Sequence, residues 1–342
     1  MCFKAFEEEY TRAQKEKRDI SRIFPDYRNY ETIADIRYDD ELTDKYYLCH
    51  FGTAYAFEYA LMFEILLRDK AMCKIKRRLS VEPLSVLSLG CGSMIDRWSM
   101  EYAIAVLGSQ GVYDFELEGY HGVDLVDWPV KMADGDFTRG DINSCFGEGI
   151  EIRDNVIVFP MILNELSSEC IDELVRRIEQ TDFPASEYYI CFSHQHSNKV
   201  KDNFNRVDHG LRISGRIINA IRQSAKRSAR KQGCRRKLFC SSDIIGKEGK
   251  ASFLRDRFGE NITDELYNEF FRDDDGFYSV GYSFRSTGDN APNRFMDYDS
   301  TFRIAISPTQ TMAQYFHQLD DVADVMNRTN TLVFQIVKIR RP

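Results

Sequence analysis

The sequence lacks any long hydrophobic run, and this absence excludes one broad class of protein. No apolar stretch approaches the roughly 20 residues that a bilayer-spanning helix needs. The first residues, MCFKAFEEEYTRAQKEKRD, are charged and have no apolar core of the kind found in signal peptides. We therefore expect no membrane partner and a cytoplasmic location.

Paired cysteines are also absent. The nine cysteines are scattered through 342 residues without a CxxC pair. An odd, scattered set is typical of reduced thiols rather than of a disulfide framework. The densest histidine group, around His194, His196 and His209, has no cysteine or carboxylate at matching spacing. These residues are expected to be solvated loop histidines just after a strand, and no metal is predicted.

The chain has no overall excess of positive charge. Its 46 Lys and Arg residues are outnumbered by 54 Asp and Glu residues, which gives a net charge of −8. One local exception is RQSAKRSARKQGCRRK, Arg222 to Lys237, with eight basic residues and no acidic one. A solvated helix face is the usual explanation, and nucleic-acid binding is the alternative. With few aromatic residues between the cations, base stacking is not indicated.

Alternating strands and helices dominate the middle of the chain. Strands are expected at 84–90, 119–128, 137–143, 155–163 and 186–194, with helices at 94–107 and 167–180. This alternation predicts an α/β fold with a doubly wound, mostly parallel sheet. Two later strands, 276–286 and 331–341, are expected to form an antiparallel edge.

The flanking segments complete the expected organisation. Residues 1–83 are predicted to be a helical N-terminal extension, which includes a long helix at 52–79 with a basic end. Residues 84–342 are predicted to be the α/β domain, with a helical, basic insertion at about 195–275.

The stretch VLSLGCGSMID, residues 86–96, places two glycines in a strand-to-helix turn. Backbone N–H groups at such a turn can hold an anion or a nucleotide. A dinucleotide fingerprint would have its third glycine at position 95, where Ile95 stands, so a nicotinamide-dependent oxidoreductase is disfavoured. A reactive Cys91 is a second interpretation, but no general base accompanies it. A tight bend without a ligand is the third.

Acidic residues at the next two strand ends add to this turn. Asp124 follows one strand and Asp141 the next, at the edge where doubly wound sheets bind ligands. A carboxylate can accept both hydrogen bonds from a ribose diol. Trp128 is placed to stack on an adenine ring, although packing under a loop explains it equally well.

In order, VLSLGCGS, GVDLVDW, GDIN and VIVFPMILNEL resemble the class I S-adenosylmethionine-dependent methyltransferases. The resemblance covers about 84–194 and the two late strands. It implies a Rossmann-like methyltransferase fold with S-adenosyl-L-methionine as cofactor. Asp124 then matches the ribose acid, Asp141 the adenine acid, and 160–165 the stretch facing the reaction. The implied cofactor contacts are Leu89, Gly90, Cys91, Gly92, Asp124, Leu125, Asp141, Ile142 and Pro160.

Three residues are the catalytic candidates under this resemblance. Asn164 would orient an amine or hydroxyl acceptor, Glu165 would take its proton, and His194 would serve as a base at the pocket rim. Capping and first-turn charge of the next helix are the alternative roles of Asn164 and Glu165. The expected activity is methyl transfer to an unidentified acceptor, RNA or another anionic substrate.

The sequence also departs from the family pattern. Ser88 stands where the family often has an acid, and Met94 where it often has a third glycine. The alternative function is therefore a catalytically silent protein of the same fold, acting as a nucleic-acid-associated or assembly factor.

Overall fold

A computed structural model describes residues 53–77, 83–111, 115–194, 200–233, 239–241, 248–249, 251–252, 255, 278–280 and 332–340. Several predictions concern residues outside these ranges: the short helices before residue 49, the helix at 311–326, the loop at 286–300, and the end of the basic stretch from 234 to 237. His196 lies outside them too.

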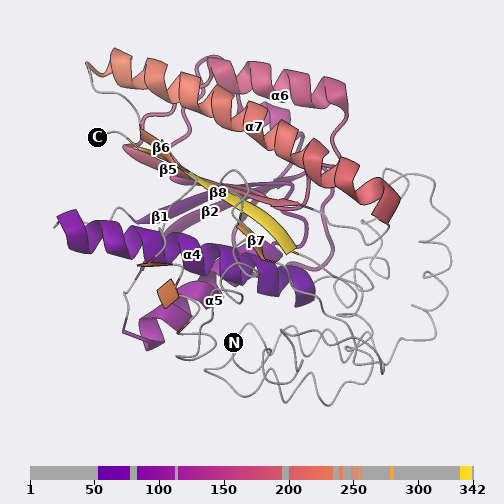
Figure 1. Cartoon of the computed structure of the whole chain (residues 1–342). Coiled ribbons are helices and arrows are strands. Elements are labelled where there is room, and N and C mark those ends of the chain that lie inside the picture. The colour runs from indigo at the N-terminus through magenta and orange to yellow at the C-terminus, as the bar shows by residue number, and fades with distance from the viewer. Residues whose placement is uncertain are drawn as a thin grey trace, which may run out of the picture.

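A single mixed sheet forms the centre of the molecule (Figure 1). Its strands are β1 (Leu84–Leu89), β2 (Leu117–Asp124), β3 (Asp136–Arg139), β4 (Val156–Phe159), β5 (Glu187–His194), β6 (Phe239–Ser241), β7 (Tyr278–Val280) and β8 (Leu332–Arg340). The order is β3-β2-β1-β4-β5-β8-β6, and β7 pairs with β8 beside this path. The first five strands are parallel, whereas β8 runs antiparallel to β5.

Helices cover both faces of this sheet. The pair α4 (Thr53–Arg77) and α5 (Ile95–Ser109) lies on one face, and α6 (Ser168–Gln180) and α7 (Val200–Lys231) lie on the other (Figure 1). The predicted doubly wound α/β fold with an antiparallel strand at one side is therefore confirmed. None of the helices in the described part of the chain has both the length and the hydrophobicity of a membrane span.

The hydrophobic core explains why these segments adopt these structures. All four residues of β4, VIVF, are buried, as expected for a strand covered on both faces. Helix α6 turns Ile171, Leu174 and Ile178 inward, and the Ser167 hydroxyl caps it by accepting a 3.1 Å hydrogen bond from the Cys170 N–H. The continuous apolar run of β4 and the helical spacing of the apolar residues in α6 are both visible in the sequence.

The region from 195 to 275 differs in one respect from its helical prediction. Helix α7 occupies 200–231, but β6 is a strand that the sequence analysis did not predict. Strand β6 pairs with β8 from Phe239 to Ser241, so it lies at the sheet edge next to β8. The division of the chain at residue 83 stays a prediction.

Helix α4 carries an unusual number of buried charges. Its buried charged residues are Glu58, Glu64, Arg68, Asp69 and Lys70. The Arg68 guanidinium lies 2.9 Å from the Glu64 carboxylate. On β8, the Lys338 ammonium lies 2.7 Å from Asp69 and 3.1 Å from Glu187 of β5. The Lys338–Asp69 ion pair joins α4 to the sheet through residues far apart in the sequence.

Candidate cofactor site

The turn after β1 is closed by its own hydrogen bonds. The N–H groups of Gly90 and Cys91 both donate to the Val123 carbonyl, at 2.7 and 3.2 Å. Gly90 has a φ of +80°, and a Cβ there would lie 2.2 Å from Cδ1 of Ile162. Only glycine fits this position. Because the N–H groups of Gly90 and Cys91 already have a partner, the turn has few backbone donors left to bind a pyrophosphate.

Cys91 is a packing residue of this turn. Its side chain is buried, and a Cβ added at Gly122 of β2 would lie 2.7 Å from the Cys91 sulfur. Burial raises the pKa of the Cys91 thiol far above its usual value, and the nearby Asp96 and Asp124 carboxylates add to the rise. A thiol that stays protonated at neutral pH is a poor nucleophile. The structure therefore does not support a reactive Cys91.

Asp124 joins the loops after β1 and β2. One carboxylate oxygen accepts a 2.9 Å hydrogen bond from the Gly92 N–H, and the other accepts a 2.9 Å bond from the Val126 N–H. Burial raises the pKa of Asp124, whereas these bonds and Trp128 act to lower it. A carboxylate has about four acceptor sites, and the two backbone bonds occupy two of them. Asp124 is therefore held in one orientation with capacity left for a ligand.

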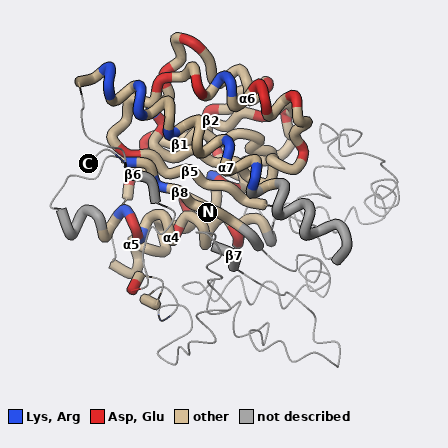
Figure 2. The backbone as a smooth tube through the Cα atoms, turned by 45° about the horizontal axis from the view of Figure 1, so that its top comes forward, with Lys and Arg blue, Asp and Glu red and all other residues tan. Residues whose placement is uncertain are grey.

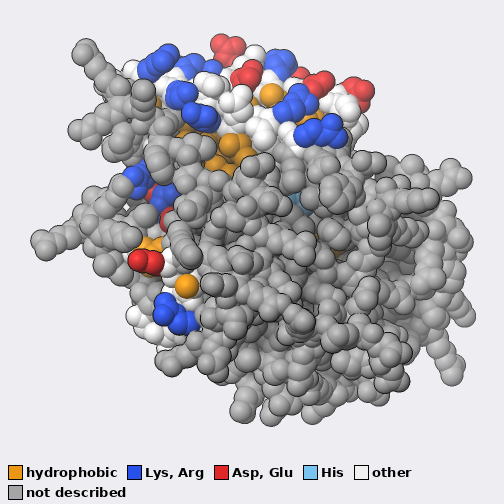
Figure 3. Space-filling model, in the orientation of Figure 1, with side chains coloured by type: hydrophobic (Ala, Val, Ile, Leu, Met, Phe, Trp, Pro, Cys, Tyr) orange, Lys and Arg blue, Asp and Glu red, His pale blue; other side chains and the backbone are white. Residues whose placement is uncertain are grey.

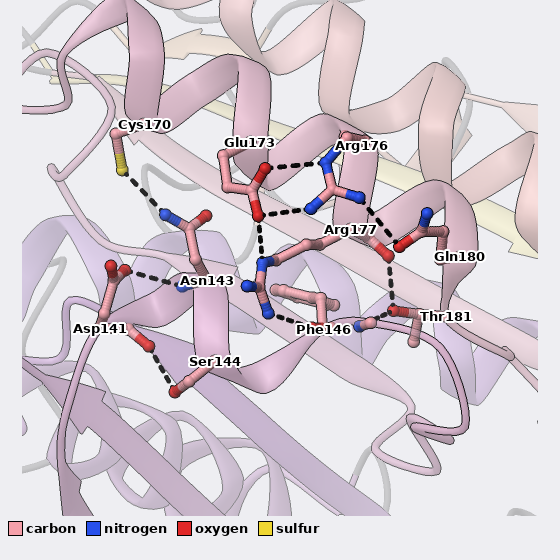
Figure 4. A network of polar contacts seen from close by, with 11 residues as sticks. Asp141, Asn143, Ser144, Phe146, Cys170, Glu173, Arg176, Arg177, Gln180 and Thr181 are labelled. Carbon is pink, nitrogen blue, oxygen red and sulfur yellow. Dashed lines mark hydrogen bonds and ion pairs between the residues drawn. The ribbon is translucent and has the colours of Figure 1, made fainter.

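Asp141 has a structural role in the loop after β3. Its carboxylate caps the short helix η3 (Ile142–Cys145) by accepting a 2.9 Å hydrogen bond from the Asn143 N–H (Figure 4). The Ser144 hydroxyl donates to the Asp141 carbonyl at 2.6 Å, and the Asn143 amide contacts the sulfur of Cys170 at 3.3 Å. The contact between Asn143 and Cys170 ties the loop after β3 to the start of α6.

One pocket of about 430 Å³ lies at the carboxyl ends of β1, β2 and β4. Eight of the nine predicted cofactor residues line it: Gly90, Cys91, Gly92, Asp124, Leu125, Asp141, Ile142 and Pro160. The ninth, Leu89, is buried in the core and is not among the lining residues. The described lining residues include three carboxyl groups, on Asp124, Asp141 and Glu165, and no lysine or arginine.

Aromatic side chains form part of the pocket wall. The Trp128 ring covers Gly92, where a Cβ would lie 3.5 Å from it. Tyr55 and Tyr59 of α4 also line the pocket, with ring centroids 6.1 Å apart. The sequence analysis did not single out these two tyrosines. Their spacing of four residues places both tyrosines on one face of the helix, and this spacing is the sequence feature that could have identified them.

Among the three catalytic candidates, only Glu165 lines the pocket. It lies in the loop before α6, since the helix cap is Ser167. Glu165 is exposed at the surface. Desolvation by neighbouring protein groups, followed by the charge of Asp124, raises the pKa of Glu165 to about 7. A carboxylate with this pKa can both bind and release a proton near neutrality.

Asn164 and His194 lie together under α7 rather than in the pocket lining. A Cβ at Gly210 would lie 2.7 Å from Nδ1 of His194 and 3.4 Å from Oδ1 of Asn164. Neither ring nitrogen of His194 has a hydrogen-bond partner in the described structure, and the same holds for both amide atoms of Asn164. His194 is 1% exposed, and burial lowers its pKa to about 4. The imidazole is therefore neutral at pH 7.

Asp96 lies deeper than its position in the first turn of α5 suggests. Its carboxyl is buried and accepts a 2.8 Å hydrogen bond from the Tyr120 hydroxyl of β2. Burial raises the pKa of Asp96 to about 6, because desolvation outweighs the contacts that favour the charged form. Asp96 is not among the residues that line the pocket.

Comparison with known proteins gives likenesses of fold only. No family model matches the chain, and no curated protein does. The plantazolicin methyltransferase BpumL in complex with SAH is 14% identical, with a TM-score of 0.32 and coverage of 99% of this chain and 97% of that one. A SAM dependent methyltransferase from Archaeoglobus fulgidus is 11% identical, with a TM-score of 0.29 over 81% and 94%.

A further solved structure, a Haemonchus contortus phosphoethanolamine N-methyltransferase 2, is 12% identical, with a TM-score of 0.24 over 80% of this chain and 52% of that one. Likenesses this distant do not identify a reaction. The residues of the pocket must therefore indicate the function.

Proposed function

We propose that this chain is an S-adenosylmethionine-dependent methyltransferase. The observation that carries the proposal is the charge of the pocket: three carboxyl groups and three aromatic rings line it, and none of the described lining residues is a lysine or arginine. Such a lining suits a cationic nucleoside and repels a phosphorylated one. S-adenosylmethionine has both a nucleoside and a sulfonium cation, and a pocket of about 430 Å³ falls in the size range of ligand sites.

The same observation argues against a nicotinamide cofactor. A dinucleotide needs backbone N–H groups for its pyrophosphate, and the N–H groups of Gly90 and Cys91 are already bonded to Val123. The acidic lining adds repulsion. The missing third glycine at Ile95 agrees with this conclusion.

The residues divide the work of binding in the proposed site. Asp124, fixed by Gly92 and Val126, would accept hydrogen bonds from the ribose hydroxyls. Trp128 would cover one face of the adenine, and Asp141 would accept from its amino group. The missing Cβ of Gly90 leaves the β1 turn close to Ile162, where the loops after β1 and β4 meet.

The bound cofactor supplies an activated methyl group, and the chain positions the acceptor and manages its proton. Glu165 would take the proton from an acceptor nitrogen or oxygen, which its pKa of about 7 allows. Asn164 and His194 would support the loop beside Glu165, with neutral groups that add no charge. Positioning accounts for most of the rate enhancement.

Calorimetric titration with S-adenosylmethionine, S-adenosylhomocysteine and NAD tests the cofactor. We expect binding of the first two and none of NAD. Asp124→Ala should weaken binding about tenfold or more, which corresponds to about 1.4 kcal/mol for lost charge-assisted hydrogen bonds. Asp127→Ala is the matched control, because Asp127 pairs with Lys131 and is not among the pocket residues. A folded protein that binds neither sulfur compound would refute the proposal.

A second experiment separates an enzyme from a silent protein of the same fold. Labelled S-adenosylmethionine is incubated with the protein and a cell extract, and RNA, protein and small molecules are then separated. Transfer that depends on Glu165 supports catalysis, with Glu165→Gln as the variant. Cofactor binding without label in any fraction would favour the silent binding protein.

A further inference from the structure

The exposed side of α7 carries a row of cations that belongs to neither the pocket nor the core. At 100° per residue, seven positions fall within an arc of about 100° opposite the buried face of the helix. They are Arg212, Gly215, Asn219, Arg222, Gln223, Lys226 and Arg230, all exposed or half-buried. The buried face holds isoleucine and alanine, such as Ile213, Ile217 and Ala225.

Two further cations of α7 are engaged with acidic residues at its side. Arg216 lies 2.6 Å from Asp172 of α6, and Lys231 lies 2.7 Å from Asp182. Figure 3 shows Lys and Arg side chains over α6 and α7 at the top of the view, with Asp and Glu side chains among them. The basic segments of α7 also stand out along the tube in Figure 2.

Three cations of the outward row differ from these paired ones. No carboxylate of the described residues forms an ion pair with Arg222, Lys226 or Arg230. The three follow one another every four residues and span about 12 Å of helix. Between residues 210 and 231 the helix has no acidic residue at all. A regular row of available cations matches a regular row of phosphates.

We propose that this face of α7 docks the backbone of duplex RNA. Two observations favour this occupant. The face has no aromatic side chain on which unpaired bases could stack, which disfavours a single strand. It also has no exposed aliphatic residue, which disfavours a membrane surface. Asn219 and Gln223 lie between the cations, and their amides can both donate to and accept from 2′-hydroxyl groups.

The net charge of the whole chain is negative, which sets the cations of this face apart from the chain as a whole. A net charge of −8 works against non-specific attraction of nucleic acid. Arg222, Lys226 and Arg230 provide a local positive field against this background. Lys226 lies about 24 Å along the helix axis from Gly210, which marks the pocket edge of the sheet. The docking face is thus separate from the pocket, and its test does not depend on methyl transfer.

The test is fluorescence anisotropy with a labelled 20-base-pair RNA duplex over a series of salt concentrations. We expect binding that weakens with salt. Arg222→Gln with Arg230→Gln should weaken it about tenfold and make the slope of log K against log salt shallower by about 2. The matched control is Arg153→Gln with Arg176→Gln, which removes the same charge from exposed arginines that pair with Glu151 and Glu173.

Several outcomes would overturn the proposal. These are a wild-type protein that does not bind the duplex at low salt, and a control variant that loses as much affinity as the α7 variant. A DNA duplex of the same sequence that binds equally well would remove the assignment to RNA. Binding to phosphatidylserine vesicles without binding to RNA would assign the face to a membrane instead.

Discussion

Two glycines of α7 provide a direct test of the packing over His194. Replacing a glycine with alanine inside a helix normally stabilises the protein by about 0.5–1 kcal/mol. At Gly215 no atom lies within 4 Å of a new Cβ, so Gly215→Ala should show this full gain. At Gly210 the new Cβ would lie 2.7 Å from Nδ1 of His194.

The gain in helix propensity is common to both variants, so their difference isolates the collision at His194. Overpacking of this kind costs about 1–3 kcal/mol. The free energy of unfolding of Gly210→Ala should therefore be lower than that of Gly215→Ala by about this cost. The free energy of unfolding from urea titration, followed by circular dichroism, gives both values.

Removing the imidazole should reverse the effect. In a His194→Ala background, Gly210→Ala should become stabilising, and the double-mutant cycle should give a coupling of about 1–3 kcal/mol. If Gly210→Ala stabilises the wild-type protein as much as Gly215→Ala does, His194 does not lie beneath Gly210. The reasoning about the neutral, buried imidazole would then fail as well.

Three further predictions concern buried ionisable groups. The folded-state pKa of Asp96, about 6, lies above the ordinary value of 3.8, so the contribution of Asp96 to stability is present below pH 4 and is lost as the pH rises through 6. Relative to Asp96→Asn, urea titrations should show the free energy of unfolding falling by up to about 3 kcal/mol across this window. A constant difference between the two proteins would contradict the burial of Asp96. Lys338→Met leaves the Asp69 carboxylate buried without its ammonium partner, which should destabilise the protein by about 3–5 kcal/mol. The double variant Lys338→Met/Asp69→Leu should recover much of this loss. A Lys338→Met protein as stable as wild type would refute the ion pair. Iodoacetamide at pH 7.5 should leave Cys91 unmodified in the native protein, because burial keeps the thiol protonated; rapid native-state modification at Cys91, mapped by mass spectrometry, would argue against this.

Much of the sheet could be predicted from local patterns. The strands at 84–89, 156–159 and 187–194 are short apolar runs, and their ends carry Gly90, Pro160 and His194. Asp124 could be placed because a polar residue at the end of a parallel strand faces the ligand edge. These features depend on neighbours in sequence, so a single chain reveals them.

Contacts across the chain could not be predicted in this way. Lys338 and Asp69 meet although 269 residues separate them, and the sequence around either gives no sign of the other. Tyr55 and Tyr59 line the pocket only because α4 packs against α5 and the sheet. His194 is covered by Gly210, and a glycine without a side chain leaves no hydrophobic signal for such a cover.

The place of β8 in the sheet has a consequence for the order in which the chain folds. Its partner β5 lies about 150 residues away, whereas β4 and β5 pair across about 33 residues. The longer closure costs about 1.3 kcal/mol more, roughly a tenfold difference in encounter probability. We expect the parallel strands to gain protection first in pulse-labelled hydrogen exchange. Strands β6 and β7, whose described strand partner is β8, can only be completed after it arrives.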